Sequence, residues 1–140
     1  MSKGKILAID FGEKILGLAV SDSNRSFSFP LKNYQRKNIN DDILFIKNMI
    51  NDKDIKLVVF GNPINSKGIE GIMSKKVKLF AEKLKSITDT PIVFFDESFT
   101  TKQAELILRD YGLDQKKMKG KKDAIAASFI LSSYLEHIND

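Results

Sequence analysis

The sequence contains no cysteine and only one histidine, and this scarcity excludes several kinds of chemistry. Without cysteine the chain can form neither disulfides nor zinc–thiolate sites, and it has no thiol nucleophile, a composition that suits a cytoplasmic protein. A Ser-His-Asp triad would need His137, which lies near the C-terminus with no nucleophile motif around it. We therefore expect His137 to be an ordinary surface residue.

Long hydrophobic runs are also missing. No apolar run approaches the roughly 18 residues that a transmembrane helix needs. The first apolar run, Ile6–Ile9, is short and ends at Asp10, unlike a signal peptide. We find no internal repeat and no linker. The 140 residues are enough for one domain with a real core, so we expect a single cytoplasmic domain over residues 1–140, without a membrane partner.

The chain is basic, with a formal net charge of +5, and many lysines are clustered. One cluster lies at residues 75–85 and the other at 116–122: Lys75, Lys76, Lys78, Lys83 and Lys85, then Lys116, Lys117, Lys119, Lys121 and Lys122. A basic surface favours a polyanionic partner such as nucleic acid. Each cluster taken alone could equally be solvated surface.

The N-terminal segment, residues 5–22, contains the most informative carboxylate. Two apolar segments, Ile6–Ile9 and Ile15–Val20, flank a turn at Gly12 and predict a β-hairpin. Asp10 ends the first strand, where a buried carboxylate is unfavourable unless a cation or hydrogen bonds neutralise it. Asp10 could therefore cap the turn or bind a cation.

The rest of the chain predicts an α/β protein. After the hairpin we expect a strand at 26–31, a polar loop at 32–38 and a helix from about 40, whose core face carries Ile39, Ile43, Ile46 and Ile50. A strand at 55–60, a helix within 68–87 and a buried strand at 92–95 follow. The chain then continues with a helix within 100–111, a lysine-rich loop at 112–122 and a largely buried helix at 123–138, with Tyr134 in the core. Right-handed crossovers then give a mixed five-stranded sheet, its first three strands antiparallel, with helices on both faces.

Acidic residues are predicted at the functional edge of this sheet, where the parallel strands end. These residues are Asp10, the pair Asp96 and Glu97, and Asp123. Oxygen ligands without histidine or cysteine favour Mg²⁺ or Mn²⁺, and two such ions can act on a phosphodiester. Asp123 could instead interact only with the helix macrodipole, and the spacing does not decide between Asp96 and Glu97.

Four sequence blocks then resemble a known family. They are Ala8–Gly12 with Lys14 and Gly17, Gly61–Asn65 with Gly68, Asp96–Thr101, and Lys119–Ala127. In this order they resemble the YqgF family, whose members are described as Holliday junction resolvases or pre-16S rRNA nucleases with an RNase H-like fold. The resemblance extends from Ile6 to Tyr134.

The resemblance implies roles for individual residues. It makes Asp10, Glu97 and Asp123 the catalytic residues and metal ligands, and so favours Glu97 over Asp96. It also implies nucleic-acid contacts by a second set: Lys14, Asn65, Thr101, Lys119 and Lys121. The chain departs from the family pattern at four positions without losing a metal ligand: Glu13, Asn62, Ser98 and Lys122. Ser98 stands where the family usually has arginine, and Glu13 would add negative charge beside the site.

The leading hypothesis is a Mg²⁺- or Mn²⁺-dependent endonuclease that processes the 5′ end of pre-16S rRNA during ribosome biogenesis. A Holliday junction resolvase is the first alternative, and it would need a homodimer to cut paired strands, whereas an RNA nuclease could be a monomer. A non-catalytic RNA-binding assembly factor is the second. A nucleotide-binding protein is the third, because Asp10, Gly12 and Gly17 also resemble the phosphate hairpin of actin-like folds, which need a second domain.

Overall fold

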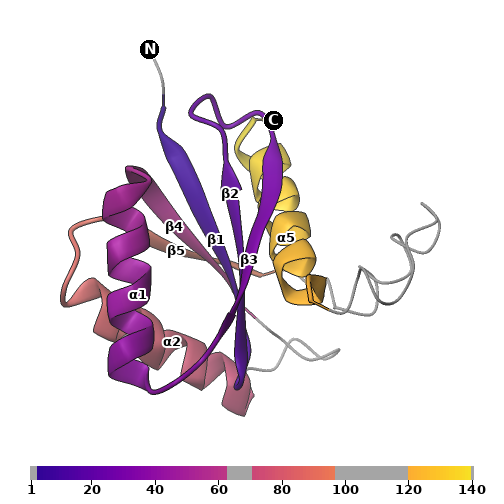
Figure 1. The fold of residues 1–140 in the computed structure, drawn as a ribbon. Helices are drawn as coiled ribbons and strands as arrows, with labels where there is room; N and C mark the ends of the chain where they lie inside the picture. Colours follow the sequence, from indigo (N-terminus) through magenta and orange to yellow (C-terminus); the bar gives the residue numbers. More distant parts are fainter. Residues whose placement is uncertain (1–2, 63–70, 97–119, 140) are drawn as a thin grey trace.

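Three successive strands, followed by helices and strands in turn, form one sheet with helices packed on it (Figure 1). The computed structural model describes residues 3–62, 71–96 and 120–139. Its elements are β1 (Lys5–Phe11), β2 (Ile15–Ser21), β3 (Ser28–Gln35), α1 (Ile39–Asp52), β4 (Ile55–Asn62), α2 (Ile72–Lys85), β5 (Ile92–Asp96) and α5 (Lys122–Asn139). The helix expected within 100–111 lies outside the described residues, as does most of the lysine-rich loop. None of the helices in the described ranges combines the length and apolar composition needed to cross a membrane.

The sheet has the strand order β3-β2-β1-β4-β5. β1 pairs with β2 and β2 pairs with β3 in antiparallel fashion, whereas β1 pairs with β4 and β4 pairs with β5 in parallel. This arrangement confirms the predicted mixed sheet. It also places β1 in the centre, so that the carboxyl ends of β1, β4 and β5 share one edge.

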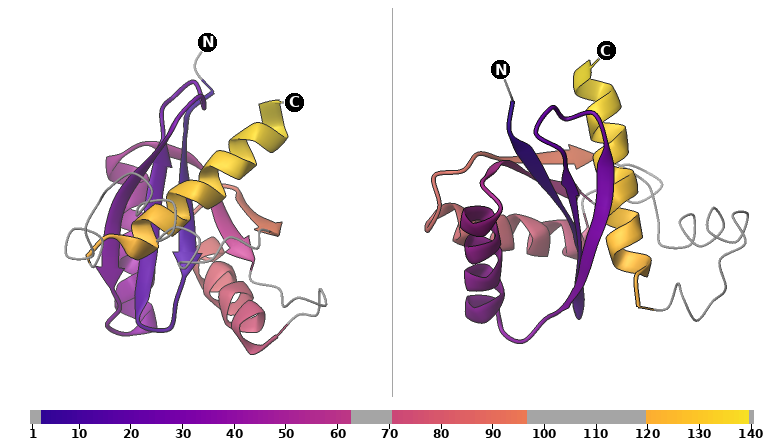
Figure 2. Two further views of the ribbon diagram at one scale, coloured as in Figure 1. Left: turned by 90° about the vertical axis from the view of Figure 1, so that its right-hand side faces the viewer. Right: turned by 45° about the horizontal axis from the view of Figure 1, so that its top comes forward.

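Helices cover both faces of the sheet: α1 and α2 lie on one face and α5 crosses the other (Figures 1 and 2). Side chains of a strand point alternately to opposite faces, and β1 shows this directly. Leu7 and Ile9 belong to the hydrophobic cluster beneath α1 and α2, while Ile6 and Ala8 belong to the cluster beneath α5. By the same alternation, Asp10 faces the side of α5.

The face beneath α5 is built from small residues, which lets the helix approach closely. Ala8 on β1 and Ala19 on β2 pack against Ala127 of α5 in one buried cluster. At Gly17 the approach is closest, because a Cβ added there would lie 1.9 Å from the carbonyl oxygen of Asp123. No residue other than glycine fits between β2 and the first turn of α5 without moving the helix.

Several element boundaries differ from those predicted. β3 runs from Ser28 to Gln35, so the strand predicted at 26–31 was placed too early and the loop predicted at 32–38 was largely wrong. The polar residues at 32–35 suggested a loop, but they belong to a strand: β3 lies at the edge of the sheet, where one side of the strand faces solvent and polar residues are tolerated. α1 begins at Ile39 with Asn38 as its N-cap, a position slightly earlier than expected.

Burial also differs from the prediction in two elements. β5 is only partly covered, with the Phe94 side chain 41% exposed, because the described residues place no strand beyond it. The last helix is buried in its first half but exposed after Leu135, and Tyr134 is partly buried. His137 is exposed, as expected, and its ring lies 5.7 Å from that of Phe95.

A buried ion pair fixes the turn between β1 and β2. Asp42 of α1 is fully buried and accepts hydrogen bonds from Arg36 Nε and Tyr34 Oη, each 2.9 Å long. The Arg36 guanidinium lies over the Phe11 ring and donates to the Gly12 carbonyl at 3.1 Å. The turn that follows Asp10 is therefore held from the α1 side of the sheet.

We expect Asp42→Ala to destabilise the protein by about 3–5 kcal/mol, since it leaves Arg36 and the Tyr34 hydroxyl buried without their acceptor. The exposed pair of Lys56 and Asp54 provides a comparison, because Lys56→Gln breaks it at a cost below about 1 kcal/mol. Urea unfolding measures both variants. Equal losses would contradict the structural role of the buried pair.

We expect Gly17→Ala to cost at least about 3 kcal/mol, at the upper end of overpacking, because the new methyl group meets backbone atoms rather than a flexible side chain. Gly71→Ala is the matched control: apart from its chain neighbours, no atom of the described residues lies within 4 Å of its added Cβ, and it should cost less than about 1 kcal/mol. Thermal and urea unfolding measure the difference. Similar stabilities for the two variants would show that α5 does not depend on the glycine.

Candidate active site

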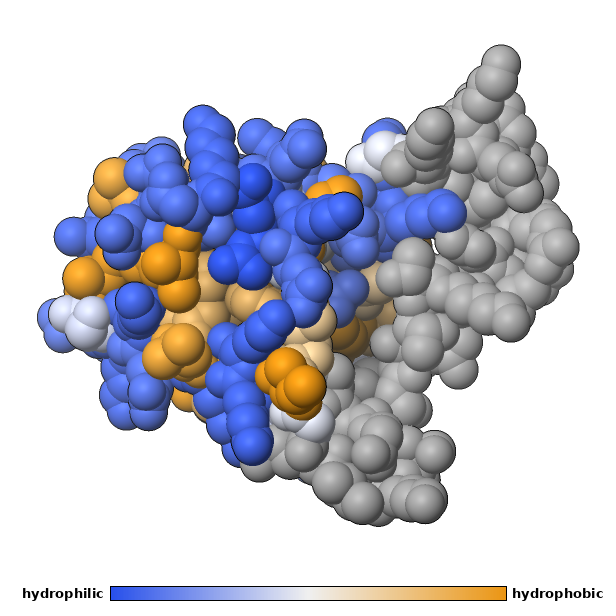
Figure 3. All heavy atoms as spheres, turned by 90° about the horizontal axis from the view of Figure 1, so that it is seen from below, coloured by the Kyte–Doolittle hydropathy of each residue, from blue (hydrophilic) through white to orange (hydrophobic). Residues whose placement is uncertain are grey.

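Asp10 and Asp123 meet at the edge where β1 ends. Asp10 is the penultimate residue of β1, and Asp123 lies in the first turn of α5. Both the end of β1 and the beginning of α5 lie at the lower side of the molecule in Figure 1. Figure 3 shows this side from below, where hydrophilic side chains surround smaller hydrophobic patches.

A row of three residues across the sheet positions the first turn of α5. Asp10 on β1 pairs with Gly17 on β2, and Gly17 pairs with Asn33 on β3. The Asn33 side-chain oxygen accepts a hydrogen bond of 2.7 Å from the backbone N–H of Ala124. Asn33 therefore satisfies one of the free N–H groups of the helix, and Gly17 leaves room for it. Together they bring Asp123 toward Asp10.

The two carboxylates are held in surroundings that disfavour their charge. Burial, and secondarily the negative charge of Asp123, raise the pKa of Asp10 to about 7. Burial also raises the pKa of Asp123, against the opposing effect of the neighbouring Lys122 charge. The fold thus brings together two carboxyl groups that solvate poorly and repel each other once ionised.

The turn between β1 and β2 carries two further residues considered from the sequence. Lys14 is exposed at this edge, and its carbonyl accepts a hydrogen bond of 2.8 Å from the Arg36 N–H. Glu13 pairs with Lys76 of α2 at 2.6 Å. The hydrogen bond and charge of Lys76 lower the pKa of Glu13. The negative charge expected beside the site is therefore balanced by a lysine of α2.

The remaining predicted site residues are only partly within the described structure. Lys121 is exposed immediately before α5, and its carbonyl accepts from Ile125 N–H at 2.9 Å. Four of the predicted residues lie outside the described ranges: Asn65, Glu97, Thr101 and Lys119. Within residues 3–62, 71–96 and 120–139, no three acidic, histidine or cysteine side chains are grouped closely enough to hold a metal ion.

The donor chemistry of the described pair fits a hard divalent cation. Carboxylate oxygens are the ligands that Mg²⁺ and Mn²⁺ prefer, and a cation between Asp10 and Asp123 would offset both desolvation and repulsion. The end of β5 lies two strands away from β1 at the same edge, with Asp96 opposite Asn62 of β4.

Two residues that build the site were not identified from the sequence as structural supports. Asn33 was placed in a loop because the residues around it are polar. Gly17 was noted only as part of a family block. The feature that could have identified them is a polar strand residue, Asn33, paired with a glycine, Gly17. This pairing can be recognised only when the register of β2 and β3 is known.

Comparisons with known proteins identify the family of the chain. The family described as "RuvX: Holliday junction resolvase" matches residues 4–137. A protein of Syntrophus aciditrophicus (strain SB) is 37% identical over 96% of this chain and 90% of its own length, and it is named "Putative pre-16S rRNA nuclease". One from Dictyoglomus turgidum, with the same name, is 36% identical over 96% of both chains.

Solved structures show the same fold at low sequence identity. Fowlpox virus resolvase, crystallised with Holliday junction DNA, aligns with a TM-score of 0.61 and 17% identity over 97% of this chain and 99% of its own. Thermus thermophilus RuvC aligns with a TM-score of 0.56 and 13% identity over 96% of both chains. These matches confirm the RNase H-like fold, and the family match confirms the expectation of a nuclease. The chain belongs to the RuvX family, to which the YqgF resemblance pointed.

Proposed function

We propose that this protein is a metal-dependent endonuclease that hydrolyses phosphodiester bonds in structured RNA, with the precursor of 16S rRNA as its substrate. The observation that carries the proposal is the convergence of Asp10 and Asp123, from opposite ends of the chain, at one poorly solvated edge. When ionised, such a pair is unfavourable unless cations bind it. The names of the relatives support the choice of RNA.

In this proposal Asp10, Asp123 and Glu97 would bind Mg²⁺ or Mn²⁺, with a site for two ions as the family resemblance suggests. When bound, the metal supplies positive charge at the phosphodiester and a means of activating water. Asp10 and Asp123 would hold the metal in place, while the close approach at Gly17 and the hydrogen bond from Ala124 N–H to the Asn33 side chain keep Asp123 in position. Preorganisation of this kind avoids reorganisation during the reaction.

Basic residues beside the carboxylates would hold the nucleic-acid backbone. Lys14 and Lys121 are both exposed at the ends of the elements that carry Asp10 and Asp123. We assign the same task to three polar or basic residues outside the described ranges, Asn65, Thr101 and Lys119. Cations around a site that carries negative charge allow a polyanionic substrate to approach it.

A Holliday junction resolvase is the second candidate, supported by the description of the family and by the shared fold of the Fowlpox virus protein. The two functions differ in substrate and in the number of sites that must act together. Junction resolution requires two symmetric sites, hence a dimer, whereas cutting of one RNA strand requires one.

We expect the purified protein to cut pre-16S rRNA fragments only with Mg²⁺ or Mn²⁺, and Asp10→Asn to lower the rate by about 100-fold or more. The experiment presents labelled precursor RNA and a four-way DNA junction side by side, with each metal and with chelator. Asp52→Asn, an exposed aspartate at the end of α1, is the control and should cut normally.

Paired symmetric nicks in the junction, with the RNA left intact, would replace the RNA assignment by the resolvase. Full activity of Asp10→Asn on either substrate would contradict the mechanism. Tight RNA binding by wild-type protein without cutting under any metal condition would favour a non-catalytic assembly factor.

Burial of Asp10 also predicts how stability changes with pH in the absence of metal. Its pKa is about 7 in the folded protein and near 3.8 in an unfolded chain, so folding takes up a proton between these values. Stability therefore falls as the pH rises through this range. We expect Asp10→Asn to be more stable than wild type by on the order of a few kcal/mol near pH 8, with little difference near pH 4.

Urea unfolding with chelator at both pH values measures this difference, again with Asp52→Asn as the control. Adding Mn²⁺ near pH 8 should stabilise wild type far more than Asp10→Asn. A constant difference between the two proteins at both pH values would show that Asp10 ionises as freely in the folded chain as in the unfolded one.

A further inference from the structure

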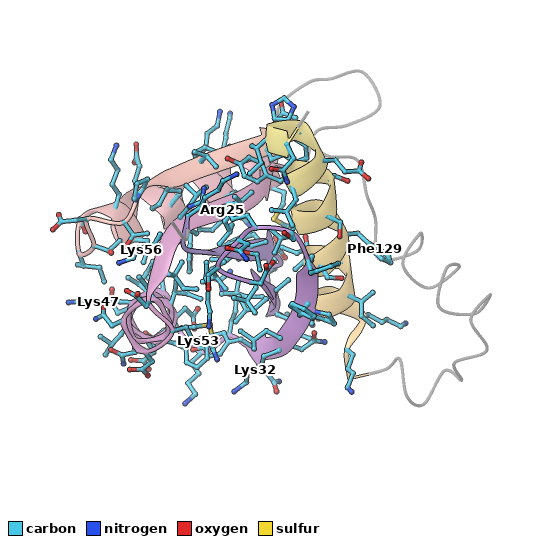
Figure 4. The ribbon with its side chains drawn as sticks, turned by 90° about the horizontal axis from the view of Figure 1, so that it is seen from above. Arg25, Lys32, Lys47, Lys53, Lys56 and Phe129 are labelled. Carbon is cyan, nitrogen blue, oxygen red and sulfur yellow. The ribbon has the colours of Figure 1, made fainter. Side chains whose placement is uncertain are left out.

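An open pocket lies at the opposite end of the sheet from Asp10, where β1 and β4 begin. Its charged lining comes from the N-terminal segment, the connection between β2 and β3, and the segment from the end of α1 into β4. The charged residues are Lys3, Lys5, Arg25, Lys53, Asp54 and Lys56. Figure 4 looks onto this end and labels Arg25, Lys53 and Lys56. We call this site the basic pocket. It contains none of the residues that the sequence predicts for catalysis or binding.

The charge of the basic pocket is strongly positive. Its lining carries five basic side chains and one carboxylate, a formal net charge of +4, against +5 for the whole chain. The carboxylate of Asp54 pairs with Lys56 at 2.9 Å. Ser23 and Gly4 complete the lining, so no aliphatic or aromatic residue contributes. This chemistry fits a phosphate-rich ligand and gives no surface for an apolar one.

Hydrogen bonds hold the wall of the basic pocket in one arrangement. The backbone N–H groups of Lys3 and Gly4 donate to the Ser23 carbonyl at 3.1 and 2.9 Å. In return, Arg25 donates through Nε to the Gly4 carbonyl at 2.9 Å and through a terminal nitrogen to the Lys3 carbonyl at 3.1 Å. The guanidinium is thereby fixed in place and still has further N–H groups for a ligand.

Unusual backbone conformations are concentrated around the same pocket. Among the described residues, the non-glycine positions with positive φ are Arg25 (59°) and Asp54 (54°), and the glycine is Gly4 (94°). All three line the basic pocket. A Cβ on Gly4 would lie 2.3 Å from Lys56 Cγ, so the Lys56 side chain crosses directly over the glycine. The basic side chains are thus arranged by specific backbone geometry rather than scattered over a surface.

We propose that the basic pocket binds the phosphate backbone of the same structured RNA that is cut at the Asp10 edge. The inference rests on the proposed function and adds a second contact region to it. Lys5 and Asp10 are five residues apart on β1, or about 17 Å at about 3.3 Å per residue. A B-form DNA duplex rises about 3.4 Å per base step and an A-form RNA duplex rises less, so an RNA stem must extend more than about five base pairs from the cut to reach both regions.

The test uses Asp10→Asn protein to prevent cutting and compares binding of two RNAs by fluorescence anisotropy. One is a hairpin of about 4 base pairs, whose stem is shorter than the separation of the two regions, and the other is a precursor fragment with a stem of about 15 base pairs. Lys5→Gln with Lys53→Gln removes two pocket charges while leaving Arg25 and its backbone contacts intact. We expect this variant to bind the long RNA about 10-fold more weakly, with a salt slope reduced by about 2.

Binding of the short hairpin should change less than about twofold, because it contacts only the Asp10 edge. Lys47→Gln with Lys83→Gln removes the same charge from α1 and α2 and is the matched control. Equal effects of the two double variants on the long RNA would overturn the proposal, since only net charge would then matter. An unchanged salt slope in the pocket variant would overturn it as well.

A separate arm distinguishes RNA from free phosphate. Thermal unfolding with inorganic phosphate is compared for wild type and the Lys5→Gln, Lys53→Gln variant. The proposal is wrong if phosphate stabilises only the wild type while both proteins bind the long RNA equally well, because the pocket then binds free phosphate rather than RNA. Failure of the proposed function gives a different result: wild type cuts no RNA, although its binding of the long RNA still depends on Lys5 and Lys53. In that case the basic pocket would still be an RNA-binding region, and only the nuclease activity would be disproved.

Discussion

The close contact between β2 and the first turn of α5 at Gly17 is the constraint on which the site depends. Burial of the small side chains beneath α5 draws the helix onto the sheet, and the missing Cβ at Gly17 lets its first turn approach. Since Gly17 pairs with Asp10 in the register, this approach brings Asp123 to Asp10. Asn33 then fixes the helix end through Ala124.

Two buried aspartates show how differently the fold treats the same side chain. Burial alone would raise the pKa of Asp42, but hydrogen bonds from the Lys37 N–H, Arg36 and Tyr34 outweigh it, and the pKa is lowered. Asp10 is also buried, with the acidic Asp123 as its charged neighbour, and its pKa is raised. Asp42 therefore stabilises the fold as an anion, whereas an ionised Asp10 is stabilised only if a cation arrives.

The two ends of the sheet carry different sets of charged groups. Where β1 ends, two poorly solvated carboxylates have exposed lysines beside them, whereas the end where β1 and β4 begin has five basic side chains around one carboxylate. The central parallel strands β1 and β4, buried at Ile6–Ile9 and Val58–Phe60, separate the two ends. An RNA bound at both ends would be held in a defined direction across the sheet, which is a way for a small nuclease to recognise structure rather than sequence.

Much of the fold could be predicted because apolar patterns are local. Buried runs such as Leu57–Phe60 and the helical spacing of Ile43, Ile46 and Ile50 indicate the elements, and crossover rules predict that β4 and β5 run parallel to β1. β3 was misplaced because an edge strand tolerates the polar residues that elsewhere indicate a loop.

For the site, the positions of the Asp10 and Asp123 carboxylates could be predicted from the sequence, but the residues that position them could not. The sequence predicts that Asp10 and Asp123 lie near one edge, since strand ends and helix starts meet there. The contact of Asn33 with Ala124 joins residues 91 positions apart and depends on a register that no local pattern reveals. The basic pocket likewise assembles Lys5, Arg25 and Lys53 from three separate segments.

The most direct test of the account is the binding of Mn²⁺ followed by NMR of the isotope-labelled protein. The paramagnetic ion broadens the signals of nearby nuclei, so it reports where the metal binds without requiring activity. We predict selective broadening of the Asp10, Gly17 and Asp123 amide signals, abolished by Asp10→Asn. Broadening elsewhere, or the same broadening in Asp10→Asn, would contradict the claim that these carboxylates form the metal site.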